Sequence, residues 1–233
     1  VYEMVLEGEA AKFIQTPGQF INVKINDSLQ PYLRRPMSIC DYDENHITII
    51  FKVVGEGTQI LSQKNIGDTL DCLTGLGNGF LDFQAQKAVV IGGGLGVPPM
   101  YNLAKTLKNH GVEVQAVLGF NSQNDIFYQK EFMDICPTYI ATMDGSVGVK
   151  GTVIDALKEN HIEFDKYYAC GPEKMLDALV LTYPENGYLS FEARMGCGFG
   201  ACVGCSCKVK TKPYKRICVE GPVLMSSEVI VNG

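Results

Sequence analysis

Four cysteines near the end of the chain have a spacing that suits a bound metal cluster. Cys197, Cys202 and Cys205 follow the pattern C-x4-C-x2-C, and Cys218 comes after twelve further residues. This is the spacing of plant-type [2Fe-2S] sites, in which a tight loop wraps the cluster and a distant cysteine supplies the fourth ligand. The glycines between these cysteines permit positive φ angles, which turn backbone N–H groups toward the sulfur atoms. We therefore predict that these four cysteines hold a [2Fe-2S] cluster.

A structural zinc site is the alternative explanation for the same cysteines, and it would make the chain a zinc-stabilised, non-enzymatic binding module. Zinc modules usually pair two C-x2-4-C knuckles, however, and this tail contains one. Cys207 does not fit the cluster spacing and is predicted not to be a ligand. A Rieske centre needs two histidines, and His46, His110 and His161 all lie outside the tail. The basic run from Lys208 to Arg216 either offsets the negative charge of the cluster or forms a solvated strand edge.

A glycine-rich turn between an expected strand and an expected helix is the second chemical pattern. Bare backbone at a helix N-terminus accommodates a pyrophosphate, although this turn is not a strict G-x-G-x-x-G. Two further segments, Thr142–Ser146 and Cys170–Met175, follow the ends of later strands, and open parallel sheets bind ligands where their strands end. No basic residue occurs from Gly119 through Gln129 to pair with a 2′-phosphate, so NAD is favoured over NADP. The residues expected to bind NAD are Gly92, Gly93, Gly94, Gly96, Cys170, Gly171 and Pro172.

A third pattern, Arg34-Arg35-Pro36-Met37-Ser38, lies in the β-rich part of the chain. A rigid Arg-Pro turn followed by a serine offers a bidentate cation and a hydroxyl to a diphosphate, although an arginine pair alone is more often a surface turn. A nicotinamide delivers two electrons as a hydride, whereas an iron–sulfur cluster accepts one at a time. A flavin performs both kinds of transfer. The sequence therefore predicts a flavin, and the β-rich part is the region left to hold it.

The first part of the chain predicts β-structure, and the middle part predicts alternating strands and helices. Short β-rich segments separated by turns suit an antiparallel β-barrel or sandwich; these segments are 20–25, 37–40 and 46–54. One short helix is expected from Thr58, as its N-cap, to Lys64. From Lys87 the pattern changes to βαβ units, which predict a doubly wound parallel sheet. The strands expected there are 88–91, 112–118, 139–142 and 167–170, and the helices are 99–109, 153–160 and 172–181.

We therefore expect a multi-domain β plus α/β protein. Its parts are an antiparallel β-barrel flavin domain (1–84), a NAD-binding α/β domain (85–187) and a small cysteine-rich [2Fe-2S] domain (188–233) with one strand candidate, 206–209. A chain of 233 residues that is 46% hydrophobic is long and apolar enough for such cores. Its net charge of −6 does not favour nucleic acid or an anionic membrane as partner. The longest uncharged run, 88–104, contains glycines and prolines that argue against a membrane span, and the start lacks a signal-peptide pattern, so a cytoplasmic location is expected.

These motifs together resemble the family of electron-transfer subunits of dihydroorotate dehydrogenase B, within the ferredoxin-reductase superfamily. The resemblance covers essentially the whole chain, and the stretch from Glu192 to Cys207 is its most specific part. Met37 and Thr74-Gly75 depart from the family pattern, in which an isoleucine and a Gly-Pro pair are expected. The segments that carry the resemblance are Arg35–Ser38, Gly57–Thr58, Leu76–Phe80, Gly92–Pro99, Cys170–Pro172 and Glu192–Cys202.

The resemblance implies an FAD site, a partner and a direction for the electrons. The family works with an FMN-containing subunit that oxidises dihydroorotate to orotate in pyrimidine biosynthesis, in a heterotetramer with two copies of each chain. Electrons would pass from FMN to the cluster and then to FAD and NAD. This chain would thus be an NAD-linked iron–sulfur flavoprotein oxidoreductase subunit without acid–base residues of its own. The residues that the resemblance places against FAD are Arg35, Pro36, Met37, Ser38, Ile50, Phe51, Lys52, Gly57 and Thr58.

An alternative keeps the same cofactors and changes the partner. The small subunits of sulfide dehydrogenase and of NADH-dependent ferredoxin:NADP oxidoreductase are similar to this chain in layout. In those subunits an aspartate stands in the cluster loop where this chain has Cys197. The cysteine therefore favours the dihydroorotate dehydrogenase family.

Overall fold

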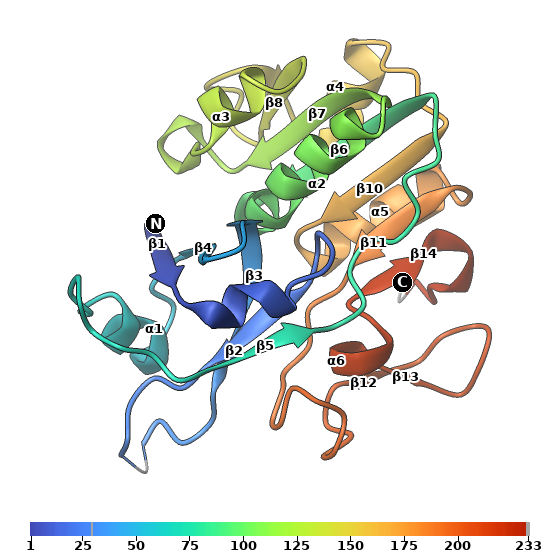
Figure 1. Ribbon diagram of the computed structural model, residues 1–233. Helices are drawn as coiled ribbons and strands as arrows, with labels where there is room; N and C mark the ends of the chain where they lie inside the picture. The colour runs from blue at the N-terminus through green and yellow to red at the C-terminus, as the bar shows by residue number, and fades with distance from the viewer. Residues whose placement is uncertain (29, 232–233) are drawn as a thin grey trace.

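The structure is a computed structural model, and it describes residues 1–28 and 30–231. Its first part is an antiparallel five-stranded sheet with the strand order β1-β4-β3-β2-β5, at the lower left of Figure 1. The predicted antiparallel β-structure is therefore confirmed, with β1 and β5 at the two edges. The strands are β1 (Tyr2–Glu7), β2 (Phe20–Val23), β3 (Arg35–Tyr42), β4 (His46–Phe51) and β5 (Cys72–Leu76).

One face of this sheet buries a compact apolar core. Alternate residues of the central strands point into it, among them Ile21, Ile39 and Ile49, and helix α1 (Glu56–Leu61) closes it with Leu61. The helix begins two residues earlier than predicted. Thr58 is not its N-cap: its hydroxyl lies at the third helical position and accepts the backbone N–H of Val54 at 2.9 Å. A side chain within the first turn of α1 thus binds the backbone N–H that precedes the helix.

The middle of the chain forms a seven-stranded sheet with the order β14-β11-β10-β6-β7-β8-β9. All neighbouring strands are parallel except β14, which pairs antiparallel with β11. The predicted parallel sheet is therefore confirmed, with an antiparallel strand added at one edge. The strands are β6 (Lys87–Gly93), β7 (Glu113–Phe120), β8 (Thr138–Thr142), β9 (Val149–Lys150), β10 (Lys166–Cys170), β11 (Gly187–Ser190) and β14 (Val223–Met225).

Helices cover both faces of this sheet, as a doubly wound fold requires. Helices α2 (Val97–Asn109) and α3 (Gln129–Met133) pack on the face to which Ala88 and Val90 belong, and α4 (Val153–Glu159) and α5 (Glu173–Thr182) pack on the face of Val89 and Ile91. Because both faces are buried, the strands read as continuous apolar runs. Helix α2 begins at Val97, two residues before the predicted start, because prolines are tolerated in a first helical turn.

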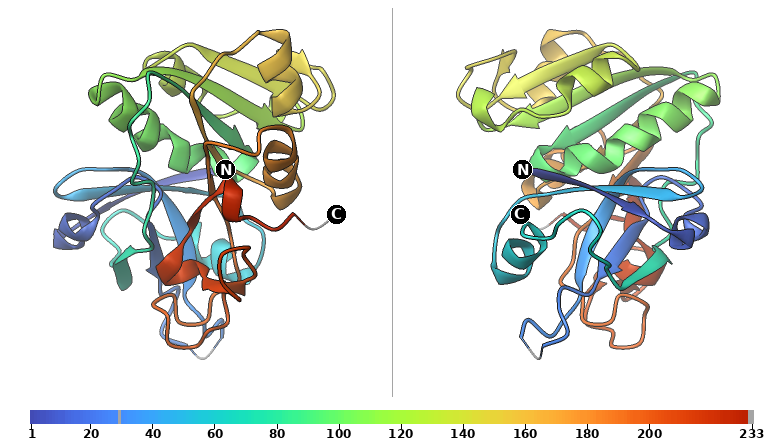
Figure 2. Two further views of the ribbon diagram at one scale, coloured as in Figure 1. Left: turned by 90° about the vertical axis from the view of Figure 1, so that its right-hand side faces the viewer. Right: turned by 60° about the vertical axis from the view of Figure 1, so that its left-hand side comes forward.

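Helix α2 also lies between the parallel sheet and the β-rich part, as Figure 2 shows. Two of its side chains contact Asp41 at the end of β3: the Asn102 amide donates to its carboxylate at 2.5 Å, and Lys105 Nζ lies 2.6 Å from it. The connection between the two sheets is anchored as well. The Asp82 carboxylate accepts hydrogen bonds from Lys166 Nζ and Tyr188 Oη, both at 2.5 Å.

The cysteine-rich tail packs beside the parallel sheet, at the lower right of Figure 1. It contains β12 (Ser206–Cys207), β13 (Lys215–Arg216) and the one-turn helix α6 (Ile217–Glu220). The strand candidate 206–209 is shorter than predicted, since Val209 makes only an isolated bridge with Val229. The boundary expected between residues 187 and 188 falls inside β11. Among the described residues, no helix combines the length and the apolarity needed to cross a membrane.

Candidate functional site

The hairpin of β12 and β13 brings Cys205 and Cys218 together. Ser206 pairs with Arg216 across this hairpin, and the backbone N–H of Ile217 donates to the Cys205 carbonyl at 3.1 Å. The two sulfur atoms consequently lie 3.2 Å apart. The backbone N–H of Cys218 also points at Cys205 Sγ, at 3.4 Å. Burial raises the pKa of the Cys218 thiol to about 12.

Cys197 and Cys202 form a second pair at the other end of the loop. The backbone N–H of Cys202 donates to Cys197 Sγ at 3.4 Å. Burial alone would raise the pKa of Cys197, but the backbone N–H groups of Cys202, Phe199 and Ala201 outweigh it and lower that pKa to about 6. The loop is therefore built to favour a thiolate at position 197.

The donor set of this loop fits the predicted group. In a [2Fe-2S] cluster each of the two irons takes two cysteine ligands, which calls for two pairs of cysteines. The structure brings Cys205 Sγ to Cys218 Sγ, and it joins Cys197 to Cys202 through the backbone N–H of Cys202. In the described part of the chain, no three or more histidine, cysteine, aspartate or glutamate side chains gather to hold a single metal ion. Cys207 lies on β12 opposite Lys215, in neither pair.

Much of the basic run after the loop is held by ion pairs inside the tail. Glu220 accepts hydrogen bonds from Lys212 Nζ and Arg216 Nε, and the Lys212 hydrogen bond is the largest cause that lowers the Glu220 pKa to about 2. Lys215 lies 2.6 Å from Glu228. These ion pairs stabilise the hairpin that follows Cys205. Lys212, Lys215 and Arg216 therefore make structural contacts within the tail.

The two motifs predicted to bind NAD meet at the ends of β6 and β10. Gly92 and Cys170 are register partners in the parallel pair. A β-carbon at position 96 would overlap the Cys170 carbonyl, and one at position 93 would lie 2.6 Å from Met175 Sδ. The turn is thus glycine-rich because the second loop packs directly against its backbone. Burial raises the pKa of the Cys170 thiol to about 12, which keeps it protonated at neutral pH.

A cavity of about 520 Å³ opens beside these loops at the carboxyl ends of the parallel strands. Of the predicted NAD residues, Gly93, Gly94 and Pro172 line it, while Gly92, Gly96, Cys170 and Gly171 do not. Sequence reasoning missed several lining residues, although their positions after strand ends could have indicated them. These residues are Asn121, Asp125 and Thr152, whereas Lys174 and Met175 belong to the segment Cys170–Met175 that was expected at this crevice.

The residues predicted to contact FAD divide into two groups. Arg35, at the start of β3, lies directly against Gly57 of α1, where a β-carbon would overlap its guanidinium. Lys52 instead lines the 520 Å³ cavity together with the glycine turn. Ile50 and Phe51, the last two residues of β4, are buried. The structure thus brings a predicted flavin residue, Lys52, to the predicted NAD cavity.

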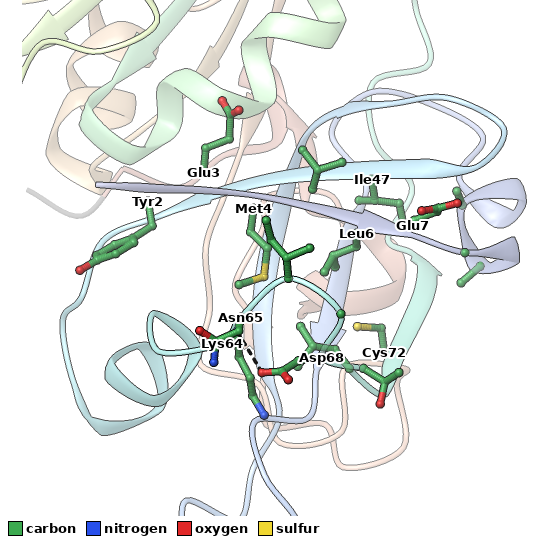
Figure 3. A pocket seen from close by; sticks show the side chains of 18 of the residues that line it. Tyr2, Glu3, Met4, Leu6, Glu7, Ile47, Lys64, Asn65, Asp68 and Cys72 are labelled. Atoms are coloured by element: carbon green, nitrogen blue, oxygen red, sulfur yellow. Dashed lines mark hydrogen bonds between the residues drawn. The ribbon is translucent and has the colours of Figure 1, made fainter.

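A larger cavity of about 700 Å³ lies within the β-rich part, between β1 and the segment from Ser62 to Thr74 (Figure 3). Met4 and Leu6 of β1 face Asp68 and Cys72 across it. Of the predicted flavin contacts, only Phe51 lines this cavity. It is therefore separate from the groups around Arg35 and Lys52.

Comparisons with known proteins agree with this arrangement. Residues 192–230 match the family described as the iron–sulfur cluster binding domain of dihydroorotate dehydrogenase B, and residues 90–180 match the oxidoreductase NAD-binding domain. A solved structure described as an NADH-dependent reduced ferredoxin–NADP oxidoreductase is 28% identical, with a TM-score of 0.89 over 98% of this chain and 84% of that one. The FAD/NAD-binding domain of a Vibrio cholerae nitric oxide dioxygenase, 18% identical with a TM-score of 0.65 over 77% of this chain and 84% of that one, shares the fold.

Two curated relatives extend the similarity over nearly the full length. The proteins named dihydroorotate dehydrogenase B (NAD(+)), electron transfer subunit, from Fusobacterium nucleatum and from Geobacillus sp. strain WCH70 are each 47% identical to this chain. Each alignment covers 99% of this chain and 93% of the relative. The resemblance inferred from the motifs is thus confirmed, and the chain belongs to the family of electron transfer subunits of dihydroorotate dehydrogenase B.

Proposed function

We propose that this chain carries electrons between NAD and a partner subunit that oxidises dihydroorotate. The observation that carries the proposal is the pairing of four cysteines, two and two, in a chain that also has a glycine-lined cavity at the ends of a parallel sheet. The names of the relatives at 47% identity supply the substrate and the partner. The chain would need that partner for dihydroorotate oxidation.

Three sets of residues would hold the cofactors. The paired cysteines support the cluster set, and the cavity lined by Gly93, Gly94 and Pro172 supports the NAD set. The contact of Arg35 with Gly57 supports the FAD set. When bound, a flavin exchanges electron pairs with a nicotinamide and single electrons with an iron–sulfur cluster. Cys197, Cys202, Cys205 and Cys218 would hold the [2Fe-2S] cluster. The residues proposed to bind FAD are Arg35, Pro36, Met37, Ser38, Ile50, Phe51, Lys52, Gly57 and Thr58, and those for NAD are Gly92, Gly93, Gly94, Gly96, Cys170, Gly171 and Pro172.

The proposed partner is the FMN-containing catalytic subunit of pyrimidine biosynthesis, with two copies of each chain. The cluster loop supports such docking because Phe199 and Val203 on it are 57% and 45% exposed, and aromatic residues are enriched at interfaces. We also propose the division into a flavin domain (1–84), a NAD domain (85–187) and a cluster domain (188–233). A cytoplasmic location is proposed as well, supported by buried reduced thiols such as Cys40.

The test uses the purified chain loaded with cluster and flavin. We expect it to reduce artificial acceptors with NADH and to produce no orotate from dihydroorotate. Addition of the partner subunit should restore orotate production with NAD. Orotate production by the chain alone, or no reaction with NADH, would contradict the proposal.

A second candidate keeps the cofactors and changes the partner. The TM-score of 0.89 to the ferredoxin–NADP oxidoreductase structure favours it, but that structure is 28% identical and the dihydroorotate dehydrogenase relatives are 47% identical. Copurification separates the two: a dihydroorotate-oxidising flavoprotein supports the first proposal and a different flavoprotein supports the second.

A further inference from the structure

Asn22 joins the β-rich part of the chain to the cluster loop. It lies on the interior strand β2, between Pro36 of β3 and Leu73 of β5, and its side chain is fully buried. Its Nδ2 donates to the backbone carbonyl of Cys197 at 3.2 Å. This hydrogen bond connects residues 175 positions apart in sequence. The first residue of the proposed ligand set is thus held by the sheet that carries the proposed flavin contacts.

The cluster loop is shaped around this amide. Gly198, directly after Cys197, has φ +81, and a β-carbon there would lie 2.5 Å from Asn22 Nδ2. An L side chain at position 198 would be strained and would also collide with the amide. The backbone of Asn22 is itself fixed, because its carbonyl accepts a hydrogen bond from Arg34 at 3.4 Å. The Asn22 amide is therefore packed closely against Gly198, and the Asn22 backbone is held by Arg34.

One of the two polar atoms of the Asn22 side-chain amide has no hydrogen-bond partner in the part of the chain that the structure describes. Among the described residues, its Oδ1 is the buried side-chain oxygen or nitrogen that has no hydrogen-bond partner. Buried polar groups are nearly always paired, so an unpaired one points to a missing group or to a local arrangement that changes. Here the neighbouring segment is the loop whose cysteines fit a cluster.

We propose that Asn22 is a positioning residue that fixes the Cys197 end of the cluster loop against β2. The inference rests on the proposed function, because it concerns a bound cluster. The amide holds the carbonyl of a proposed ligand cysteine, and its buried Oδ1 leaves one acceptor available to a donor of the loop. Groups that orient metal ligands in this way govern how firmly the metal is held.

The test compares the loaded wild type with Asn22→Leu, which has a similar size and no hydrogen bond. We expect iron release to an excess of chelator to be about 10- to 100-fold faster, with an altered EPR spectrum of the reduced cluster and unchanged FAD content. Asn102→Leu is the matched control, since Asn102 is also buried and bridges to Asp41 at 2.5 Å; it should release iron at the wild-type rate. Wild-type iron release and EPR spectrum in Asn22→Leu would overturn the inference.

A second comparison applies where Asn22→Leu does not fold. Gly198→Ala should release iron faster than wild type, and the same change in an Asn22→Ala background should have a smaller effect, because the shorter side chain leaves room for the new methyl group. An effect of equal size in both backgrounds would overturn the role of Asn22. A wild-type chain that takes up no iron would contradict the proposed function itself, whereas an iron-loaded wild type with insensitive variants contradicts only the inference about Asn22.

Discussion

Cys218 lies beside Cys205 although twelve residues separate them, because the intervening chain turns back as a short hairpin. The sulfur–sulfur distance of 3.2 Å comes from that hairpin and from the one-turn helix that presents Cys218. Cys207 is closer in sequence, yet it faces Lys215 across the hairpin. At the scale of single residues, the structure therefore agrees with the spacing: it pairs the proposed ligand Cys218 with Cys205 and leaves Cys207 out of that pair.

The first prediction uses that difference. Cys218→Ser should purify without a stable [2Fe-2S] cluster, because one thiol pair loses a member, whereas Cys207→Ser should keep it. Iron and acid-labile sulfide content, together with visible absorption, measure the outcome. Cluster loss in Cys207→Ser with retention in Cys218→Ser would reverse the assignment.

The second prediction concerns Gly96. Its replacement by alanine places a methyl group on the Cys170 carbonyl, and such overpacking costs about 1–3 kcal/mol of unfolding free energy. The shift of the turn should also slow NADH-dependent acceptor reduction by on the order of 100-fold. Thermal unfolding and steady-state kinetics check both effects. Gly111→Ala is the kinetic control: unlike Gly96, which has φ −80, Gly111 has φ +79 and strains an alanine, but its β-carbon would meet nothing within 4 Å; equal kinetic losses in the two variants would refute the explanation.

At the scale of elements, the sequence predicted those strands whose residues are buried. The four longer strands of the parallel sheet, β6, β7, β8 and β10, are apolar on both faces, and their ends were predicted to within two residues. The edge strand β1 was missed because none of its residues is fully buried. Strand β5 was missed as well, and Gly75 within it has φ +65. Strands β9, β11 and β14 were missed too, because strands of four residues or fewer carry little sequence pattern.

The residues of the candidate sites also divide into those that the sequence predicts and those that it does not. The cysteines and the glycine turn are local patterns, so the spacing of their residues is enough to predict a chemistry for them. The contact of Asn22 with Cys197 spans 175 positions, and Lys52 reaches a cavity built mainly by another part of the chain. No local pattern encodes such contacts, because they depend on how the sheets pack together.

The third prediction concerns the connection between the sheets. Asp82→Ala removes the hydrogen bonds from Lys166 and Tyr188 and should lower the unfolding free energy by about 2 kcal/mol at neutral pH. Burial alone would raise the pKa of Asp82, but these two hydrogen bonds lower it below 3.8. Because the folded pKa is the lower one, the contribution is present above 3.8 and is lost as the pH falls through the folded pKa.

The measurement is urea unfolding of wild type and Asp82→Ala from neutral pH down to below 3.8. The difference between the two proteins should be constant near neutral pH and should shrink in acid. Glu163→Ala, which removes an exposed ion pair with Lys87, serves as the control and should change stability much less. A difference that grows in acid would contradict the assigned pKa direction.

At the scale of the whole molecule, the parts are joined by polar contacts that bring the proposed cofactor sites together. Tyr128 Oη donates a hydrogen bond to Glu3 of β1 at 2.9 Å. The Asp41 carboxylate accepts hydrogen bonds from Asn102 and Lys105 of α2. The tail is held to β2 through Asn22. The first two contacts thus join the β-rich part to the α/β part, and the third holds the proposed cluster ligand Cys197 from another part of the chain, which suits a protein whose function depends on the separation of its cofactors.

The last prediction tests where the partner docks. The cluster loop exposes Phe199 and Val203, and Val203 has φ +60, a strained backbone angle for a β-branched residue. If this loop enters the partner, Phe199→Ser should raise the dissociation constant of the complex by about 10-fold or more, without changing NADH-dependent acceptor reduction by the chain alone. Phe13→Ser is the matched control, because Phe13 is 65% exposed and lies on the β-rich part. Calorimetric titration with the purified partner measures both, and a larger loss in Phe13→Ser would place the interface away from the cluster loop.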